Sequence, residues 1–239
     1  MGQSYFIWKG EDCRAKGVKL RGPVPIVWPE ERVKHIEIPG RSGDLTETEG
    51  EQIYNSYIQT ATILVHGAYR AREIKNWLKG SGFVTFHAEP DKKQAARVIG
   101  AVTLDRHSYN HDWWEGEVQF YCQPLKQLLL ESTVQITSSG TSVVNSGDVN
   151  SRPKITATAS GTSLTMTIGG KTLTLTGITS GKDYVIDCDA MEVFITESNV
   201  TTLVTNKSVG DFPVLAPGSN TVTGSGWSKL VIDRRERFL

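Results

Sequence analysis

The sequence predicts a mainly β protein of two domains, because its character changes part-way along the chain. Up to about Thr133 strand patterns are mixed with one helical pattern, whereas from Val134 the chain is rich in Thr, Ser and Gly without helical periodicity. The 239 residues and the 38% hydrophobic share suffice for two packed cores. We expect a sheet or β-sandwich with one α-helix over residues 1–133, and an antiparallel β-sandwich over residues 134–239.

The helix is predicted at residues 69–79, where Ala71, Ile74, Trp77 and Leu78 fall on one face at spacings of three and four. Gly80 follows as a stop signal. A turn is expected at residues 89–93, and residues 52–66 form either one long strand or a bent pair. Other strands of this domain are expected at residues 4–8, 33–38, 83–87, 97–104 and 113–121.

In the second domain, Gly169 and Gly170 separate two strands that alternate between apolar residues and Thr. Pairing across this turn places Leu164 opposite Leu175 and Met166 opposite Leu173, which predicts a sheet buried on one face. A second hairpin is expected between residues 184–188 and 191–196. Residues 216–220 and 224–226 are expected as turns before the last strands, and residues 138–150 as a mobile interdomain loop.

Charge and cysteine content exclude several classes of protein. Residues 1–133 hold 17 basic and 17 acidic residues and the remainder holds 9 of each, so neither half has the basic excess of a nucleic-acid-binding domain. Cys13, Cys122 and Cys188 lie far apart and are odd in number, which favours buried thiols over disulfides or a zinc site. We also expect no signal peptide and no transmembrane helix, because no sustained apolar stretch occurs.

No pattern in the chain predicts catalysis or a bound cofactor. Asp187 and Asp189 are a carboxylate pair or, as we favour, part of a hairpin turn. His107 and His111, with Asp105 and Asp112 nearby, would suit a metal on a helix, but a loop between strands is favoured. The glycines around Ser42 lack the spacing of a nucleophile elbow and instead predict a tight loop that displays Arg41.

Three features of the chain are considered as possible binding surfaces for other proteins, polyanions or sugars. Trp113 and Trp114 are adjacent on a predicted strand and point to opposite faces, so one indole either lies at an interface or is covered by the helix. Arg234, Arg235 and Arg237 alternate with acidic residues, which favours ion pairs over a polyanion site. Aromatic residues of the second domain invite a sugar-binding interpretation, although we expect Phe212 and Trp227 to plug the ends of the sandwich.

Short motifs in both halves resemble the distal tail proteins of siphophages. In the second half the segments are 151–155, 185–188, 211–220 and 230–239, which resemble the galectin-like C-terminal module of that family. In the first half, segments 38–43, 82–86 and 120–124 resemble its ring-forming, or belt, domain. The motif residues are Pro39, Gly40, Gly43, Pro124, Phe212, Pro213, Pro217, Gly218 and Asn220.

This resemblance implies a structural protein of the virion, made in the host cytoplasm and located at the tip of a long non-contractile tail. Members of the family form a hexameric ring that joins the tail tube protein to a tail-associated adhesion or lysin protein and to receptor-binding or baseplate proteins. Residues 1–133 would build the ring around a channel through which DNA passes, with the edges of strands 52–66 and 113–121 pairing between subunits. Arg41, Trp113 and Trp114 are our candidate interface residues.

Two other classes of function stay open at this point. A carbohydrate-binding, lectin-like module would bind soluble sugars through the second half alone and would not need a ring. An adhesin-like bacterial surface protein is disfavoured because we expect no signal peptide. The chain also has no room for an inserted carbohydrate-binding module of the kind that larger family members carry.

Overall fold

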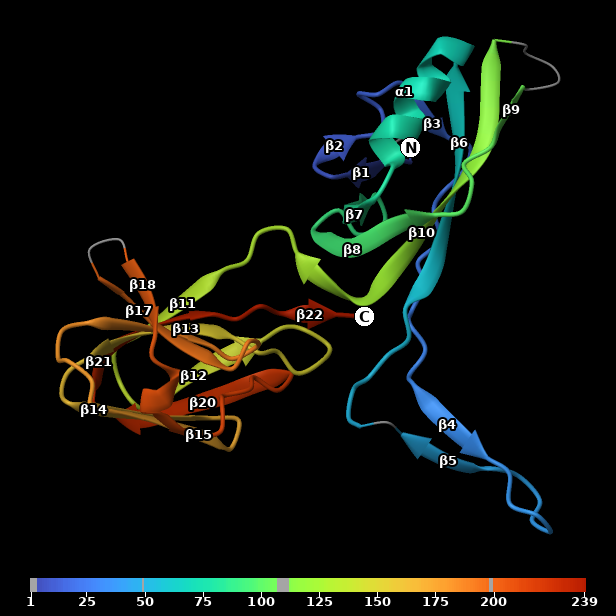
Figure 1. Ribbon diagram of the computed structural model, residues 1–239. Helices are drawn as coiled ribbons and strands as arrows, with labels where there is room; N and C mark the ends of the chain where they lie inside the picture. Colours follow the sequence, from blue (N-terminus) through green and yellow to red (C-terminus); the bar gives the residue numbers. More distant parts are fainter. Residues whose placement is uncertain (1–3, 49, 107–111, 198–199) are drawn as a thin grey trace. The chain divides into compact units, whose positions relative to one another are not determined.

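The chain is divided into two compact units, with the boundary in the sequence near residue 130 (Figure 1). The first comprises Met1–Leu129 together with Leu239, and the second comprises Leu130–Phe238. The predicted class is confirmed, since strands dominate and α1 is the α-helix of the described residues. The computed structural model describes residues 4–48, 50–106, 112–197 and 200–239.

The first unit is built on one antiparallel sheet with the strand order β2–β1–β7–β8–β10–β6–β3, and β9 also pairs with β10. Alternate residues of its central strands are buried, among them Ala61 and Ile63 on β6 and Val118 and Phe120 on β10. This period of two gives the sheet one apolar face that lies in a core. The strands are β1 (Phe6–Trp8), β2 (Glu11–Asp12), β3 (Val18–Leu20), β6 (Tyr57–His66), β7 (Ser81–Phe86), β8 (Lys92–Ile99), β9 (Leu104–Arg106) and β10 (Trp113–Leu128).

Helix α1 (Ala68–Leu78) packs on that apolar face. Its Ile74 and Leu78 side chains are buried in the same core as Phe6 and Trp8. The Trp77 ring stacks on Phe6, with 5.7 Å between the ring centroids. The prediction of the helix is therefore confirmed, with each end one residue earlier than expected.

Three strand predictions in this unit were wrong in their bounds. The strand expected over 97–104 is instead β8, which starts at Lys92 inside the predicted turn and ends before Gly100, whose φ of 72° turns the chain away. Of residues 52–66, only Tyr57–His66 form a strand. Strand β10 continues to Leu128 because a register shift between Cys122 and Lys126 accommodates Pro124, which has no N–H to donate.

A separate two-stranded hairpin lies between β3 and β6 in the sequence. Strands β4 (Val33–Ile36) and β5 (Leu45–Thr48) pair with each other and with no other strand of the described residues. In Figure 1 this hairpin extends away from the main sheet of its unit. Gly40 and Gly43 in its loop both have a φ of 82°, a conformation that other residues adopt at a cost.

The second unit is a sandwich of two antiparallel sheets, in the orders β11–β21–β13–β16–β17–β18 and β12–β20–β14–β15–β19. One core contains buried side chains from both sheets, as the prediction of a sandwich requires. A short 3-10 helix, η1 (Thr205–Lys207), precedes β19. The strands are β11 (Thr133–Ile136), β12 (Thr141–Asn145), β13 (Lys154–Ala159), β14 (Ser163–Ile168), β15 (Lys171–Thr176), β16 (Asp183–Asp187), β17 (Glu192–Glu197), β18 (Val200–Leu203), β19 (Ser208–Gly210), β20 (Gly218–Ser225), β21 (Trp227–Asp233) and β22 (Arg237–Phe238).

Both hairpins predicted in this unit are confirmed. Strands β14 and β15 pair with Leu164 opposite Leu175 and Met166 opposite Leu173, and these four side chains are buried. Strand β16 pairs with β17 in the same manner. The turn between β14 and β15 uses two residues with positive φ, 58° and 73°, where glycine is favoured.

Two loop predictions in this unit were wrong. Residues 138–150 do not form a continuous loop, because they contain β12, which pairs with β20 and buries Val143 and Asn145. The turn expected at residues 216–220 ends early, since β20 already begins at Gly218. In both cases the polar composition suggested a loop, but an edge strand with one buried face has a similar composition.

The described residues contain no helix that is long and apolar enough to cross a membrane. The three cysteines are free and buried, as predicted. Desolvation raises the pKa of Cys122 and of Cys188 to about 12 and also raises the pKa of Cys13.

We therefore predict that all three thiols resist alkylation in the folded protein at mildly alkaline pH, because a buried thiol is inaccessible and stays protonated. A maleimide time course followed by mass spectrometry should show no rapid labelling of the native chain and three labels in denaturant. Rapid modification of any one cysteine in the native chain would contradict this assignment.

Candidate interaction surface

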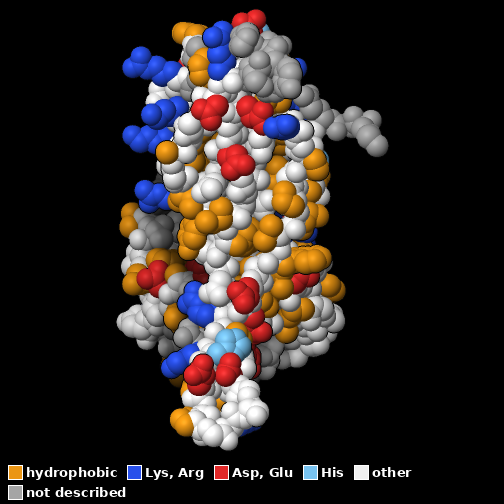
Figure 2. All heavy atoms as spheres, turned by 90° about the vertical axis from the view of Figure 1, so that its right-hand side faces the viewer, with side chains coloured by type: hydrophobic (Ala, Val, Ile, Leu, Met, Phe, Trp, Pro, Cys, Tyr) orange, Lys and Arg blue, Asp and Glu red, His pale blue; other side chains and the backbone are white. Residues whose placement is uncertain are grey.

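One face of the sheet in the first unit has no element of its own unit packed on it. We call it the open face. Its apolar members include Ile58, Phe83 and Tyr121, whose exposed fractions are 51%, 44% and 41%. Figure 2 shows a band of hydrophobic side chains below a group of acidic ones. The open face consists of Ile58, Thr60, Thr62 and Leu64 on β6, Phe83 on β7, Ala95, Arg97 and Ile99 on β8, and Glu115, Glu117, Gln119 and Tyr121 on β10.

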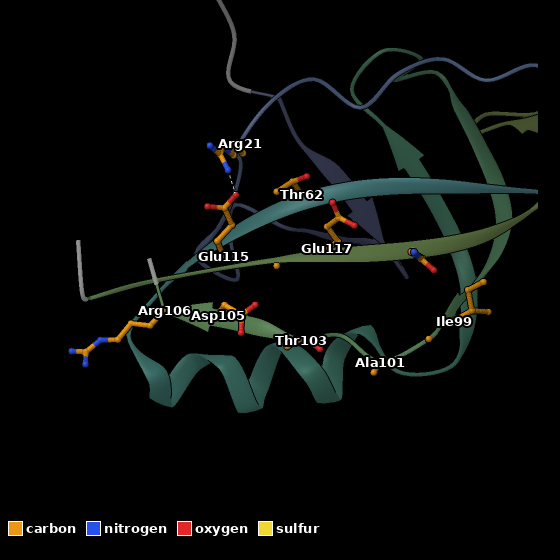
Figure 3. A pocket seen from close by; sticks show the side chains of 12 residues that line it. Arg21, Thr62, Ile99, Ala101, Thr103, Asp105, Arg106, Glu115 and Glu117 are labelled. Carbon is orange, nitrogen blue, oxygen red and sulfur yellow. Dashed lines mark hydrogen bonds and ion pairs between the residues drawn. The ribbon is translucent and has the colours of Figure 1, made fainter. Parts of the chain in front are cut away.

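The acidic end of the open face is a hollow of about 790 Å³ between β9, β10 and β6 (Figure 3). Asp105, Glu115 and Glu117 contribute carboxylates, and Arg21 forms an ion pair with Glu115. Gly116 permits the close approach of β9, since a Cβ at this position would lie 2.0 Å from the Thr103 carbonyl oxygen. Arg106 also lines the hollow, so three carboxylates face two guanidinium groups and the net charge is slightly negative.

The acidic hollow does not resemble a metal site. Among the described residues, no three His, Cys, Asp or Glu side chains are placed to hold a metal ion. His107 and His111, the metal ligands considered from the sequence, lie outside the described residues.

The apolar end of the open face is a second hollow, of about 560 Å³, over β7, β8 and β10. We call it the aromatic socket. Its floor includes Ala95, and Phe83 and Tyr121 stand on either side with Arg97 and Gln123. The Lys93 ammonium group lies 5.4 Å from the centroid of the Phe83 ring. A large apolar group with a nearby negative charge would fit this socket.

The sequence did not identify the aromatic socket. Its residues come from three strands, and only the pairing of Ser81 with Arg97 and of Arg97 with Tyr121 brings them together. The available signal was the presence of apolar residues on both faces of these strands. Such a pattern predicts that the second face also has a packing partner.

Of the candidate interface residues, Trp113 and Trp114 lie on opposite faces of β10, as strand geometry requires. Trp114 packs against the core of the first unit. Trp113 lies on the other face, edge-on to the His66 ring at 5.2 Å and with the Lys19 ammonium group 4.8 Å from its centroid. Trp113 therefore lies on the open face, where it is half-buried between side chains from neighbouring strands of the same sheet.

The two strands predicted to offer edges to a neighbouring subunit are largely paired within their own sheet. Strands β6 and β10 pair with each other over ten residues, from Trp113 opposite His66 to Cys122 opposite Tyr57. Strand β10 has β8 and β9 on its other side, and β6 has β3. Neither strand is therefore available as a full edge for sheet extension.

The hairpin loop holds Arg41 and three of the motif residues, Pro39, Gly40 and Gly43. All four are exposed. The Arg41 N–H donates to the Ile38 carbonyl at 3.1 Å, which closes a tight turn. The loop connects two strands, so the strand-to-helix setting of a nucleophile elbow is absent, and Arg41 projects from the hairpin as predicted from its position between glycines.

In the second unit the motif residues of segment 211–220 have structural roles. Phe212 packs against the sandwich core, and Pro213 is buried. Asn220 closes the turn that contains Pro217: its Oδ1 accepts from the Ala216 N–H at 2.9 Å, and its Nδ2 donates to the Ala216 carbonyl at 2.7 Å and to the Gly218 carbonyl at 3.0 Å. These contacts fix the conformation of the turn within this segment.

The arginines near the C-terminus form ion pairs, as their pattern predicted. Arg235 donates to both carboxylate oxygens of Asp187, at 2.8 and 2.9 Å. Arg234 lies 3.1 Å from the buried Glu236, whose Oε1 also accepts from the Ser146 N–H at 2.6 Å. Arg237 lies 4.0 Å from Glu131. The segment after β21 is thus tied to several other parts of the sandwich.

Asp187 also holds the turn that follows β16. Its Oδ1 accepts from the N–H groups of Asp189, at 3.1 Å, and Ala190, at 3.2 Å. The hydrogen bonds from Arg235 are the largest of the effects that lower the pKa of Asp187. The turn interpretation of Asp187 and Asp189 is therefore confirmed.

Comparison with known proteins finds a sequence likeness within the second unit. Residues 146–238 match the family described as siphovirus-type tail component, C-terminal domain. This match covers less than half of the chain. The resemblance of the chain to siphophage distal tail proteins is confirmed. A search of curated proteins gives no significant match.

Solved structures extend this likeness to the fold of the whole chain. The crystal structure of SPP1 Dit, described as a paradigm of the hub adsorption apparatus in phages that infect Gram-positive bacteria, superposes with a TM-score of 0.78 at 19% identity, covering 100% of both chains. Two structures of the phage P2 baseplate in its activated conformation, with Ca and with Sr, give TM-scores of 0.49 and 0.47 at 8% identity, again over 100% of both chains. The chain therefore shares the fold of SPP1 Dit.

We predict that Asp187→Asn lowers the stability of the second unit by about 2 kcal/mol at neutral pH, because a charged bidentate pair is lost while the amide oxygen still accepts in the turn. Since the pKa of Asp187 is lowered in the folded state, the contribution is complete above the ordinary value of 3.8 and is lost as the pH falls through the folded value. Urea unfolding across that range measures both effects.

Asp189→Asn is the matched control. It also removes one negative charge, but the Asp189 side chain is 64% exposed and lies two residues from Asp187 in the sequence. We expect its stability to stay close to that of the wild type. Equal effects of the two substitutions would contradict the assigned role of the Asp187–Arg235 pair.

Proposed function

We propose that this protein is the structural hub at the tip of a long, non-contractile phage tail. The observation that carries the proposal is that an independent sequence match and a whole-chain fold match lead to the same class of protein. The role is geometric: the chain holds other tail proteins in place and carries out no reaction. The protein is then a component of the virion, made in the host cytoplasm.

In this proposal the first unit builds a ring from identical copies, and six is the number that the family resemblance implies. Rotational closure requires each copy to offer two different, complementary patches. The open face supplies one such patch, because it combines exposed apolar side chains with a fixed backbone and has no cover from its own unit.

The ring surrounds the path of the DNA, which passes through as cargo. A channel that lets DNA pass must not retain phosphates, and the balance of 17 basic against 17 acidic residues in residues 1–133 supports this requirement. The carboxylates of Asp105, Glu115 and Glu117 at the acidic end of the open face repel a polyanion, which makes this end our candidate for the channel lining.

The partners of the ring are the tail tube protein on one side and a tail-associated adhesion or lysin protein on the other. Receptor-binding or baseplate proteins dock around it, with the second unit as their attachment point. The exposed Arg41 loop is a further candidate contact, because a hairpin that pairs with no other strand of the described residues can reach a neighbouring protein.

The lectin-like alternative receives less support from the second unit. Sugar-binding sites stack saccharide rings on exposed aromatic side chains, and the five aromatic residues of this unit are buried or half-buried. These five residues are Tyr184, Phe194, Phe212, Trp227 and Phe238. Trp227 and Tyr184 lie in the sandwich core.

Light scattering of the full-length chain at low and high salt tests the proposal. We predict a mass of six times the 26.3 kDa chain, or a multiple of that. A monomer at every concentration together with binding on a glycan array would favour the lectin over the hub.

A further inference from the structure

An exposed tryptophan elsewhere in the same chain is suited to the aromatic socket. Trp28 is 77% exposed, an unusual position for a side chain whose burial contributes so much to interfaces. We propose that Trp28 of one copy inserts into the aromatic socket of the next copy, and that this contact closes the ring. The inference rests on the proposed ring and names the two patches that it requires.

The backbone on either side of Trp28 is held in place by hydrogen bonds. Trp28 lies between Pro25 and Pro29, which restrict the backbone of this extended segment. Before Trp28, the Pro25 carbonyl accepts from Gln59 Nε2 at 2.8 Å. After it, the Glu30 carbonyl accepts from the Asn55 N–H at 2.8 Å. Because the backbone of this segment is already ordered, less conformational freedom is lost when Trp28 binds, which favours its use as a docking residue.

The socket has the size and chemistry that an indole requires. Its volume of about 560 Å³ lies within the range of pockets that take ligands of this size. Phe83 and Tyr121 offer ring faces and edges on either side, and the small Ala95 leaves the space between them open. An inserted indole would cover apolar surface of both aromatic side chains.

Charges beside the two patches are complementary. Glu30 and Glu31 follow Trp28 and are exposed, and the side chain of their basic neighbour Arg32 is directed to Asn55, with Nε 3.1 Å from Oδ1. Lys93 and Arg97 flank the socket. Opposite charges at the rim steer the two patches together and fix their orientation.

The positions of the patches suit a contact between copies. Trp28 lies near β6, through the anchors at Gln59 and Asn55, whereas the socket lies over β7, β8 and β10. Because the two patches differ, the contact is heterologous, and repeating it around an axis produces a ring.

The test uses the full-length chain and measures its assembly by light scattering over a range of concentrations. We expect Trp28→Ala to raise the concentration for half-assembly about tenfold or more, and Ala95→Trp, which fills the socket, to do the same. Tyr69→Ala is the matched control, because Tyr69 on α1 is 79% exposed and lies outside both patches. It should assemble as the wild type does, and circular dichroism checks that every variant is folded.

Charge reversal gives a second, independent readout of the same contact. The variant with Glu30→Lys and Glu31→Lys, and the variant with Lys93→Glu and Arg97→Glu, should each assemble more weakly. Mixing the two variants in equal amounts should restore assembly, because each copy then meets a neighbour of opposite charge.

The outcomes separate this contact from the ring itself. If the wild type forms a ring and the folded Trp28→Ala and Ala95→Trp variants assemble equally well, the contact is wrong and the hub proposal stands. If mixing the charge variants restores nothing, these two patches do not meet. A wild type that stays monomeric at all concentrations overturns both the ring and the contact.

Discussion

Packing on only one face of its sheet is the constraint on which the first unit depends. Helix α1 and strand β1 supply part of its core, and the rings of Phe6 and Trp8 both contact the ring of Phe120 on β10. No second helix of the described residues is present to cover the other face. The strands nevertheless place Ile58, Phe83 and Tyr121 there, so the first unit folds with apolar side chains exposed on that face.

The second unit covers its own apolar sheet faces. Its two sheets bury each other's apolar faces, and its terminal segment is fixed by the Asp187–Arg235 pair and by the buried Glu236. Its aromatic side chains are used for packing. A self-sufficient sandwich joined to a unit with an open face is the arrangement that we expect when one unit assembles and the other carries attachments.

The sequence predicted the features that depend on local patterns. Gly169 and Gly170 dictate a tight turn, and the alternation of Leu, Met and Thr around it defines the register, so the β14–β15 hairpin was predicted residue by residue. The spacing of Ile74 and Leu78 identified the helix in the same way. The pattern of the terminal arginines indicated ion pairs, although it did not reveal Asp187 as the partner of Arg235.

Features that depend on distant pairing were not predicted. Residues 138–150 were expected as a loop because a polar edge strand and a loop have similar compositions. Strands β6 and β10 were expected at edges, but they are each other's neighbours across almost fifty residues of sequence. The aromatic socket arises only when β7, β8 and β10 lie side by side, and no local pattern brings Phe83, Ala95 and Tyr121 together.

The measurement that tests the central claim most directly is immunogold electron microscopy of phage particles that carry this protein, using antibodies raised against the purified chain. The hub assignment predicts that gold particles mark the end of the tail farthest from the capsid. Labelling along the tail tube or on the capsid, or intact virions that contain none of the chain, would contradict it.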